Sequence, residues 1–297
     1  MIKIKSKNKN KVIRDIVRKY YLDMLQREPD ENGLNFYVEQ LKKNSIKESD
    51  LPKIFMESYE YHLLHPINVD KKTTTTNQWM KLDWNARAKN AEYFSGSIWG
   101  ESENEYWISG KQDCNSILGL KTPQFDIITQ NMNPKKMKVL EIGCGPGRIL
   151  VPMSKIFGEV IGVDISSEMI QMAKQNTKDI PNCTVYENSD SDLTQFSNDY
   201  FDFCYSNTVF QHIPEKEIIR NYIFEVARVL KSGSAFGFHV RGNTNDIQYE
   251  VNTWNGAEFS IDEINQIVST NDFEVLEEKK ILEYNDTFHW LMCKLKK

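Results

Sequence analysis

The chain has 297 residues, of which 40% are hydrophobic, and a formal net charge of −5 at pH 7. This length allows one large domain and one small one, and the acidic balance argues against a protein whose main partner is nucleic acid. No stretch approaches the ~18 apolar residues that a membrane-spanning helix needs. We therefore expect a folded protein with no membrane span and no nucleic-acid partner.

Cysteine usage indicates a reducing compartment. The chain has five widely spread cysteines and no C-x-x-C pair: Cys114, Cys144, Cys183, Cys204 and Cys293. This pattern is typical of reduced thiols and of neither a disulfide framework nor a zinc site. The lysines at alternate positions from 3 to 11 are not followed by the apolar segment of a secretion signal. We expect a cytoplasmic protein that holds no metal and begins with a solvated, disordered tail.

Residues 13–64 predict a compact helical unit. Apolar residues recur at three- and four-residue spacing over 12–25 and again over 34–41, which indicates two helices with one buried face each. The segment between them is rich in turn residues, and Asp30 is a good N-cap for the second helix. Ser49 or Asp50 can cap a third helix.

The same region resembles a known small domain. The string R-E-P-D-E-N-G-L-N-F at 27–36, followed by F-M-E-S-Y-E-Y at 55–61, is similar to a helical domain of unknown function with the patterns L-G-R-x-P-D-x-x-G-L-x-Y-W and F-x-x-S-x-E-F. Gln26 and Tyr37 depart from that family, which has glycine and tryptophan there. The domain recurs in bacterial surface and glycan-related proteins, so the resemblance implies docking of a protein partner through residues 13–64 and no catalytic residues.

A polar, low-complexity string, D-K-K-T-T-T-T-N at 70–77, predicts an interdomain linker. We therefore expect a small all-α domain at 1–70, a linker at 71–77 and a larger domain at 78–297. The larger domain begins with a helical region that we place at 78–130.

The string K-V-L-E-I-G-C-G-P-G-R-I at 138–149 predicts a buried strand, a glycine-rich turn and a helix that begins near Gly147. Glycines at alternate positions let the backbone turn tightly and approach a ligand closely. The dinucleotide fingerprint G-x-G-x-x-G would need its third glycine at position 148, where Arg148 stands. The pattern here is E-x-G-x-G-x-G, with Glu141 at the end of the strand.

Further apolar strands follow at regular intervals. The string V-I-G-V-D at 160–164 ends in an acid, the position at which a doubly wound fold holds the hydroxyls of a ribose. Other strands are predicted at 183–187, 201–206, 234–240, 273–280 and 288–295, with helices at 216–230 and 261–269 among them. This alternation predicts an α/β fold with a doubly wound, mainly parallel sheet and helices on both faces.

Together, E-x-G-C-G-P-G-R, the acid Asp164 and F-D-F-C-Y-S at 201–206 resemble the class I S-adenosylmethionine-dependent methyltransferases over residues 78–297. The resemblance implies a Rossmann-like sheet of seven strands. Its last strand would run antiparallel beside the strand at 234–240. It also implies S-adenosyl-L-methionine as the cofactor.

Ligands of doubly wound sheets bind outside the carboxyl ends of the strands, where the strand order reverses. There the glycine loop would pass under the methionine and ribose, Asp164 would accept from the ribose hydroxyls, and Ile165 and Met169 would contact the adenine. Asp190 and Asp192 compete for the adenine edge, and we favour Asp190. Family resemblance places Ser109 and Gly110 at the methionine end, and we expect Ser206 there too. The predicted cofactor-binding residues are Glu141, Gly143, Cys144, Gly145, Gly147, Asp164, Ile165, Met169, Asp190, Ser191, Ser206, Ser109 and Gly110.

The acceptor side shows no dedicated set of residues. Methyl transfer needs a base only where the acceptor is a hydroxyl or a protonated amine, and the candidates are His212, in F-Q-H-I-P at 210–214, and His239. For each of them a structural role is the competing interpretation. The N-P-P-Y type motif of amino methylation on bases or amides is missing, because S-N-T-V stands at 206–209.

We therefore expect a methyltransferase that acts on a small molecule or a glycan, with O-methylation favoured. The glycan preference rests on the proteins in which the small helical domain recurs. A natural-product or lipid methyltransferase is an alternative reading. So is an interaction protein that binds S-adenosylmethionine without catalysis.

Overall fold

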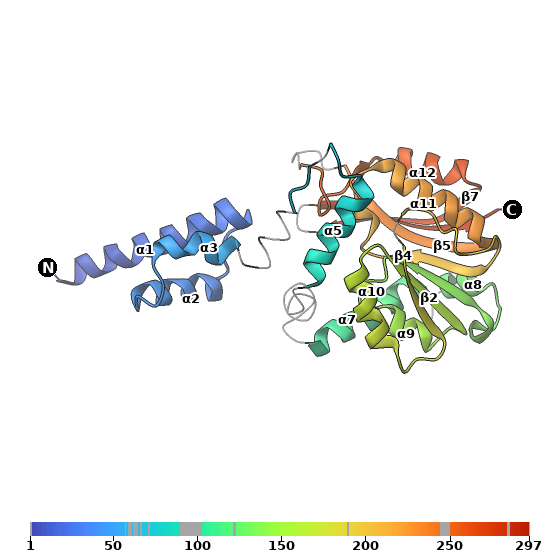
Figure 1. Cartoon of the computed structure of the whole chain (residues 1–297), viewed down its shortest axis with the longest axis horizontal. Helices are drawn as coiled ribbons and strands as arrows, with labels where there is room; N and C mark the ends of the chain where they lie inside the picture. Colours follow the sequence, from blue (N-terminus) through green and yellow to red (C-terminus); the bar gives the residue numbers. More distant parts are fainter. Residues whose placement is uncertain are drawn as a thin grey trace. The chain divides into compact units, whose positions relative to one another are not determined.

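The computed structural model describes residues 2–56, 58, 61, 65, 67–70, 72–89, 103–120, 123–188, 190–243, 250–283 and 286–296. The chain divides into two compact units, Met1–Pro66 and Ile67–Lys297. Figure 1 shows the first unit as a group of helices and the second as a sheet with helices packed against it.

The first unit is helical, as the apolar spacing predicts. Its elements are α1 (Ile2–Leu25), α2 (Glu31–Lys42), the 3-10 helix η1 (Glu48–Asp50) and α3 (Leu51–Met56). Asp30 caps α2, since its Oδ1 accepts from the N–H of Gly33 at 2.8 Å. Buried side chains of α1, α2 and α3 form the core of this unit: Val17, Tyr21, Leu25, Leu34, Val38, Leu51 and Phe55.

The N-terminus differs from the disordered tail that we expected, because α1 begins at Ile2. Residues 2–25 contain neither proline nor glycine, and lysine is a good helix former. No residue in the lysine-rich segment therefore interrupts the helix.

The second unit is built on one mixed sheet. Its strands are β1 (Lys138–Ile142), β2 (Glu159–Asp164), β3 (Cys183–Glu187), β4 (Phe201–Ser206), β5 (Leu230–Gly242), β6 (Glu258–Phe259), β7 (Phe273–Glu283) and β8 (Asp286–Leu295). The order is β3-β2-β1-β4-β5-β8-β7, with β6 paired to β5. Strands β1 to β6 pair in parallel, and β8 runs antiparallel to both β5 and β7.

This sheet confirms the predicted fold class, including the antiparallel strand beside β5. Strands β2 and β3, which follow β1, lie on one side of the β1–β4 pair, and β5 lies on the other side, so the strand order reverses between β1 and β4. The expected ligand position therefore lies at the carboxyl ends of these two strands. The two-residue strand β6 was not predicted, because two residues are too few to show an alternating pattern.

Helices cover both faces of the sheet. One buried cluster joins the sheet to α7 (Glu103–Leu118), α8 (Pro123–Thr129), α9 (Leu150–Ser154) and α10 (Ser167–Thr177). The other joins it to α11 (Lys216–Val229) and α12 (Ile261–Thr270). Val139 and Leu140, neighbours on β1, belong to different clusters, because successive side chains of a strand point to opposite faces.

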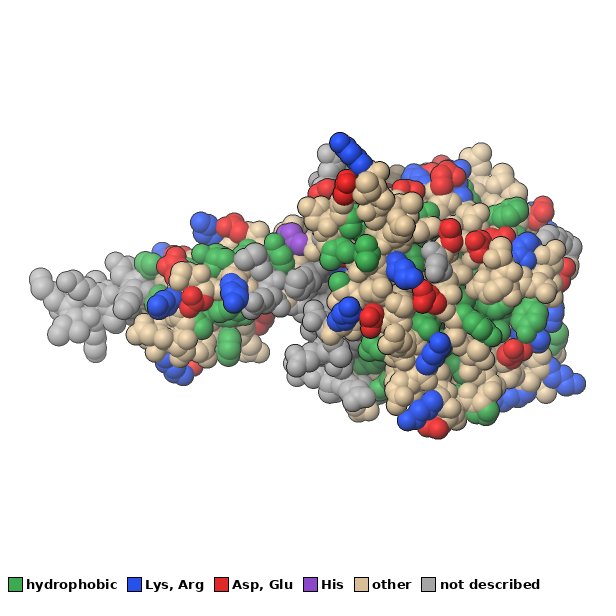
Figure 2. Space-filling view, viewed as in Figure 1, with side chains coloured by type: hydrophobic (Ala, Val, Ile, Leu, Met, Phe, Trp, Pro, Cys, Tyr) green, Lys and Arg blue, Asp and Glu red, His purple; other side chains and the backbone are tan. Residues whose placement is uncertain are grey.

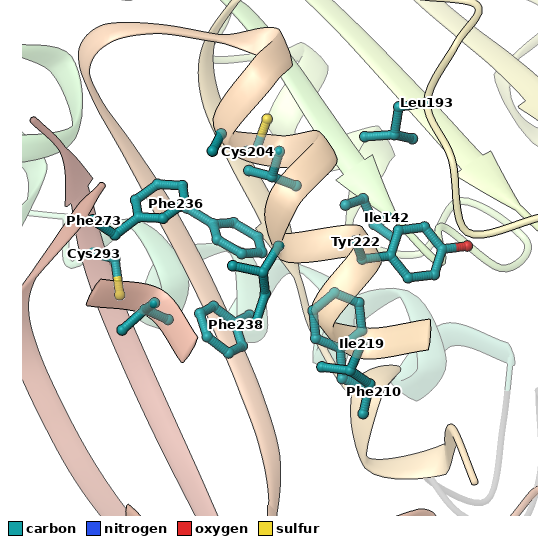
Figure 3. Close-up of a cluster of buried hydrophobic side chains, with 14 of the residues drawn as sticks. Ile142, Leu193, Cys204, Phe210, Ile219, Tyr222, Phe236, Phe238, Phe273 and Cys293 are labelled. Atoms are coloured by element: carbon teal, nitrogen blue, oxygen red, sulfur yellow. The ribbon is translucent and has the colours of Figure 1, made fainter. Parts of the chain in front are cut away.

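The cluster under α11 contains a group of aromatic side chains. Figure 3 shows Phe236 and Phe238 of β5 close together, with Phe273 and Cys293 on one side and Tyr222 of α11 on the other. The rings of Phe236 and Phe238 stack with centroids 4.6 Å apart. The hydroxyl of Tyr222 points out of the cluster and donates to the backbone oxygen of Asp190 at 3.1 Å. The core therefore fixes the position of the loop after β3.

Helix α9 begins at Leu150, three residues later than we expected. The backbone of Gly147 has a φ of +92°, which is incompatible with a right-handed helix. The glycine-rich segment therefore extends as a loop to Ile149, the N-cap of α9.

The segment predicted as a linker, 71–77, includes the start of a helix. Helix α5 (Thr76–Ala88) begins within it and is capped by Thr75, which exchanges hydrogen bonds with Gln78 in a capping box. Upstream, the N–H of Ile67 donates to Oδ1 of Asp83 at 2.8 Å. The division into two compact units falls after Pro66, and Ile67 is bonded to α5 of the second unit. Residues 90–102 and 121–122 of the predicted helical region at 78–130 lie outside the described residues.

None of the described helices is both long and apolar enough to cross a membrane. On the face seen in Figure 2, acidic and basic side chains are intermixed over the second unit. The remaining short elements are the 3-10 helices η2 (Pro134–Lys136) and η3 (Phe210–His212), and η3 follows β4 at the carboxyl edge of the sheet.

Candidate active site

The glycine-rich loop after β1 is held by the end of β2. The N–H groups of Gly143 and Cys144 donate to the backbone oxygen of Val163 at 2.8 and 3.0 Å. The N–H of Gly145 donates to Oδ2 of Asp164 at 2.8 Å. The φ angles of Gly143 and Gly145 are +75° and +50°, a region that glycine adopts without strain. The loop therefore turns around the carboxyl end of β2.

The glycines of this loop differ in what surrounds them. A Cβ at Gly143 would lie 2.2 Å from Cγ2 of Val209, a residue that follows β4. A Cβ at Gly145 would meet no heavy atom within 4 Å, and one at Gly147 would come no closer than 3.6 Å, to Cγ2 of Thr177. Gly143 is thus required by the packing of the protein itself. Gly145 borders open space in which a ligand can lie against the backbone.

Asp164 ends β2 and is partly exposed. Its Oδ1 accepts from the N–H of Ser166 at 2.9 Å, and its Oδ2 accepts from Gly145. Burial raises the pKa of this carboxyl group to about 6, so it remains mainly ionised at pH 7. Each carboxylate oxygen can accept a second hydrogen bond. Asp164 therefore keeps the capacity to accept from a ligand.

The first turn of α10 follows directly. Ser166 caps the helix, accepting from the N–H of Met169 at 3.1 Å. Met169 is buried, and Ile165 is partly buried against the aromatic cluster. Both apolar residues proposed for the adenine thus lie beside Asp164, with Ile165 the more accessible of the two.

Glu141 lies inside the sheet beneath the loop and is 2% exposed. The pairing register places it opposite Gly162 of β2 and Tyr205 of β4, and the Tyr205 hydroxyl donates to its Oε2 at 2.8 Å. Burial raises the pKa of Glu141 to about 8. At neutral pH the carboxyl group is therefore largely protonated, and its hydrogen bond with Tyr205 joins β1 to β4.

In the loop after β3, the two aspartates proposed for the adenine edge differ in their hydrogen-bond partners. Asp192 binds its own neighbour, accepting from the hydroxyl of Thr194 at 2.8 Å. Asp190 is exposed and accepts from the N–H of Ser191 at 2.8 Å and from the side chain of Asn77 in α5. Ser191 is itself buried. Of the two acids, Asp190 is the one that faces another element at the carboxyl edge.

The residues that we expected at the methionine end have partners within the protein. Ser206 is fully buried, and its hydroxyl donates to the backbone oxygen of Ile142 at 3.1 Å. Ser109 accepts from Nη1 of Arg148 at 3.1 Å. A Cβ at Gly110 would lie 2.2 Å from the backbone oxygen of Arg148. Ser109 and Gly110 thus join α7 to the glycine loop, and their part in binding a ligand stays a prediction.

The two candidate histidines are joined through one glutamine. His239 Nε2 lies 2.5 Å from Oε1 of Gln211, and His212 Nε2 lies 3.1 Å from Nε2 of the same side chain. His212 Nδ1 lies 2.7 Å from the backbone oxygen of Trp254. Both rings are buried, and burial lowers the pKa of His212 to about 3 and that of His239 to about 4. Both are therefore neutral at pH 7.

Helix α5 contacts three separate segments at the carboxyl edge of the sheet. Its Asn77 reaches Asp190 after β3, and its Asn85 accepts from the hydroxyl of Ser166 after β2 at 2.7 Å. On the far side, Oδ2 of Asp83 accepts from the hydroxyl of Thr253 at 2.6 Å. The helix therefore links the segments after β2 and β3 to the segment that contains Thr253 and Trp254.

A buried ion pair anchors α5 beside Trp254. Arg87 Nε lies 2.7 Å from Oδ2 of Asp83, and both side chains are 2% exposed. The guanidinium also lies over the rings of Trp84 and Trp254, with 5.3 Å to each centroid. The Trp254 ring in turn contacts His212, with centroids 4.6 Å apart.

Sequence patterns do not identify Asp83, Asn85 or Gln211 as site residues. Their partners lie 170, 81 and 28 residues away in the chain. An acid and an arginine four residues apart, as at 83 and 87, are ordinarily a surface pair of a helix. The one local signal is the position of Gln211 next to His212, in the segment after β4.

Comparison with known families identifies both units. Residues 139–233 match the model of the methyltransferase domain, and residues 4–64 match the domain of unknown function DUF4214. The chain is 31% identical over 133 residues to demethylmenaquinone methyltransferase of Staphylococcus saprophyticus, covering 42% of this chain and 55% of that protein. It is 26% identical over 98 residues to ubiquinone biosynthesis O-methyltransferase of Bartonella quintana, covering 33% and 38%. The chain thus spans about half or less of these curated relatives.

Solved structures share the fold. Magnesium protoporphyrin IX methyltransferase from Synechocystis PCC 6803, with bound S-adenosylmethionine, has a TM-score of 0.55 at 16% identity over 76% of this chain and 100% of that one. Phosphoethanolamine N-methyltransferase 2 of Haemonchus contortus has a TM-score of 0.57 at 15% identity over 76% and 61%. At these identities the likeness concerns the fold. Sequence and fold together place the second unit in the class I S-adenosylmethionine-dependent methyltransferase family, joined here to an N-terminal DUF4214 domain.

Proposed function

We propose that this chain transfers a methyl group from S-adenosylmethionine to a hydroxyl group of a small-molecule or glycan acceptor. The observation that carries the proposal is the environment of Gly145. Its N–H is fixed by Asp164, while a Cβ at this position would meet no heavy atom within 4 Å. A backbone surface with open space beside a carboxylate is what a ribose-bearing ligand needs.

The residues at this edge fit the cofactor. The backbone at Gly143–Gly147 would pass beneath the methionine and ribose, and Asp164 would accept from the ribose hydroxyls. Asp190 would meet the adenine edge, after giving up its contact with Asn77. Bound S-adenosylmethionine supplies an electrophilic methyl group on a sulfonium.

At the acceptor end, His239 would act as the general base. The acceptor oxygen forms a bond to the methyl carbon while the carbon–sulfur bond breaks and its electron pair stays on sulfur. The acceptor proton passes to the neutral imidazole of His239. Aligning the three atoms in this way lowers much of the barrier, and the base contributes typically 10²–10⁴-fold.

The choice of acceptor rests on two indirect supports. The O-methyltransferase of Bartonella quintana acts at oxygen by its name, and the N-terminal domain resembles one found in glycan-related proteins. For the same reason we propose that residues 13–64 dock a protein partner. We also propose a cytoplasmic location, supported by five cysteines without a close pair.

The first test is calorimetric titration of the whole chain with S-adenosylmethionine and S-adenosylhomocysteine. We expect micromolar binding of both and a loss of at least tenfold in Asp164→Ala, because two charge-assisted hydrogen bonds to the ribose are worth ~1.5–3 kcal/mol each. Absence of binding in the wild type would overturn the proposal. Unchanged affinity in Asp164→Ala would overturn the assignment of the ribose site.

The second test concerns the acceptor. The protein is incubated with S-adenosylmethionine and, separately, nucleotide sugars, glycans, quinone precursors and phosphoethanolamine, and S-adenosylhomocysteine formation is measured. The proposal expects turnover with a sugar or another hydroxyl acceptor and a strongly reduced kcat in His239→Phe. Turnover with phosphoethanolamine alone would replace O-methylation by N-methylation.

A further inference from the structure

A chain of hydrogen bonds links the two loops that meet at the acceptor end. It runs from His239 at the end of β5 through the side chain of Gln211 to His212, and from there to the backbone oxygen of Trp254. The order of donors along this chain can be worked out from its fixed end, because a backbone oxygen only accepts.

The backbone oxygen of Trp254 determines the tautomer of His212. Since the oxygen of Trp254 accepts, Nδ1 of His212 carries a hydrogen. The ring is neutral because burial lowers its pKa to about 3, so Nε2 of His212 has no hydrogen and accepts. Its partner 3.1 Å away is therefore the amide nitrogen of Gln211, which leaves the amide oxygen facing His239.

The orientation of the Gln211 amide then determines the tautomer of His239. The amide oxygen of Gln211 accepts, so Nε2 of His239, 2.5 Å away, carries the hydrogen. In the neutral ring, Nδ1 is consequently the atom with a free lone pair. The described residues provide no hydrogen-bond partner for this Nδ1, and the side chain keeps 8% of its surface exposed.

We propose that Gln211 is a positioning residue that holds His239 in the tautomer with a hydrogen on Nε2 and a lone pair on Nδ1. Nδ1 is then the atom that takes the proton of the acceptor. The role of Nδ1 in catalysis rests on the proposed function, whereas the tautomer does not. Gln211 itself acts through His239 and contacts neither the cofactor nor the acceptor.

The surroundings of Gln211 hold its backbone in place. The N–H of Gly256 donates to its backbone oxygen at 2.9 Å, and a Cβ at Gly256 would lie 2.6 Å from that oxygen. Upstream, Thr208 has a φ of +57°, an uncommon conformation for a β-branched residue. Such outliers persist where the surrounding structure over-determines them, and they cluster at functional sites. The backbone around Gln211 is therefore restrained to one conformation.

The direct test is ¹⁵N NMR of the histidine side chains in the full chain at pH 7.5. The His239 signals are assigned by their loss in His239→Phe. In the wild type we expect a protonated Nε2 and an unprotonated Nδ1. Gln211→Leu should give a mixture of tautomers, and Gln211→Glu should raise the pKa of His239, because a carboxylate favours the cationic ring.

The matched control is Gln124→Leu, which removes a partly buried glutamine whose Nε2 donates to the backbone oxygen of Ile117 at 2.7 Å. It should leave the His239 signals unchanged. A wild-type His239 with its hydrogen on Nδ1 would overturn the inference even if every Gln211 variant failed to fold. So would a folded Gln211→Leu protein whose His239 tautomer is unaltered.

Kinetics distinguish this inference from the proposed function. With an acceptor in hand, Gln211→Leu should lower kcat about tenfold, part of the contribution of a general base, and leave the affinity for S-adenosylmethionine unchanged. Failure to bind S-adenosylmethionine would refute the proposed function while the tautomer could still be read. A tautomer change in Gln211→Leu without any change in kcat would refute the positioning role.

Discussion

At the scale of single residues, two glycines of one loop perform different tasks. Gly143 makes room for Val209 of the protein, since a Cβ there would lie 2.2 Å from a methyl carbon of that residue. Gly145 borders open space, since a Cβ there would meet no heavy atom within 4 Å. The two positions share a positive φ, so the backbone strain of a substitution is similar at both.

The first prediction contrasts these glycines. Gly143→Ala should lower the free energy of unfolding by more than ~2 kcal/mol, because Val209 must move and overpacking of this kind costs ~1–3 kcal/mol in addition to strain. Gly145→Ala should cost only the ~1 kcal/mol of a left-handed alanine but weaken S-adenosylmethionine binding at least tenfold. Urea unfolding and calorimetry measure the two effects. Equal stability losses with intact binding in Gly145→Ala would show that the open space is not the cofactor's.

The second prediction concerns pH and Glu141. Its pKa is about 8 in the folded protein and 4.5 as an unperturbed group, so the folded state binds this proton more tightly than the unfolded state does. The resulting stabilisation is complete below about pH 4.5 and is lost as the pH rises through 8. Glu141→Gln, which keeps an acceptor for Tyr205, should not show that loss. Between pH 5 and 8 the unfolding free energy of the wild type should fall, relative to the variant, by on the order of 3 kcal/mol. Parallel curves would contradict a protonated Glu141.

At the scale of elements, α5 is the helix that joins the separate parts of the site. It contacts the segments after β2, after β3 and beyond β5 through side chains of Asn85, Asn77 and Asp83. The ion pair of Asp83 with Arg87 is buried at the acceptor end. Loss of this pair should therefore affect more than one loop.

The third prediction follows for Asp83→Ala. Removing the acid leaves a buried guanidinium without its carboxylate, and breaking a buried pair in this way costs ~3–5 kcal/mol. The matched control is Glu217→Ala in α11. Glu217 pairs with Arg220, three residues further along the same helix, and the Glu217 side chain is 82% exposed. That change should cost at most ~0.5 kcal/mol. Similar losses in the two variants, measured by urea unfolding, would mean that α5 is not anchored by this pair.

The elements also show how far local sequence reaches. The strands β1, β2 and β4 are mainly apolar segments of five or six residues, and the acid at the end of β2 and the glycines after β1 are local features as well. These local features therefore predicted the sheet, with the glycine loop and the acid at its carboxyl edge, and the cofactor-binding role of these residues stays a prediction. Local features did not predict Gln211, because its role is defined by His239, 28 residues away. The start of α5 was missed because Thr75 is one of four threonines, and only the bond to Gln78 distinguishes it as a cap.

At the scale of the whole molecule, every candidate cofactor residue belongs to the second unit. The boundary after Pro66 leaves Ile67, the cap Thr75 and all of α5 with that unit. Ile67 is tied to α5 twice, since its N–H donates to Asp83 and its backbone oxygen accepts from Nε1 of Trp79 at 3.0 Å.

The fourth prediction compares two truncated chains. A chain that begins at Ile67 should bind S-adenosylmethionine within about twofold of the full-length affinity and unfold at a similar urea concentration. A chain that begins at residue 78 should be less stable by about 3 kcal/mol, because it loses the Thr75 cap, worth ~1 kcal/mol, and the two hydrogen bonds of Ile67, worth ~1 kcal/mol each. Weak binding by the longer fragment would assign the first unit a part in the cofactor site.

The position of β8 between β5 and β7 has a consequence for synthesis of the protein. Among the described strands, the last one to leave the ribosome fills an interior place in the sheet. Until it emerges, β5 and β7 have no common partner, and both expose edges that can pair with other chains. Nascent chains stalled at this point should be prone to aggregation and should recruit chaperones. Translation speed over the final strands is therefore a property on which the yield of folded protein should depend.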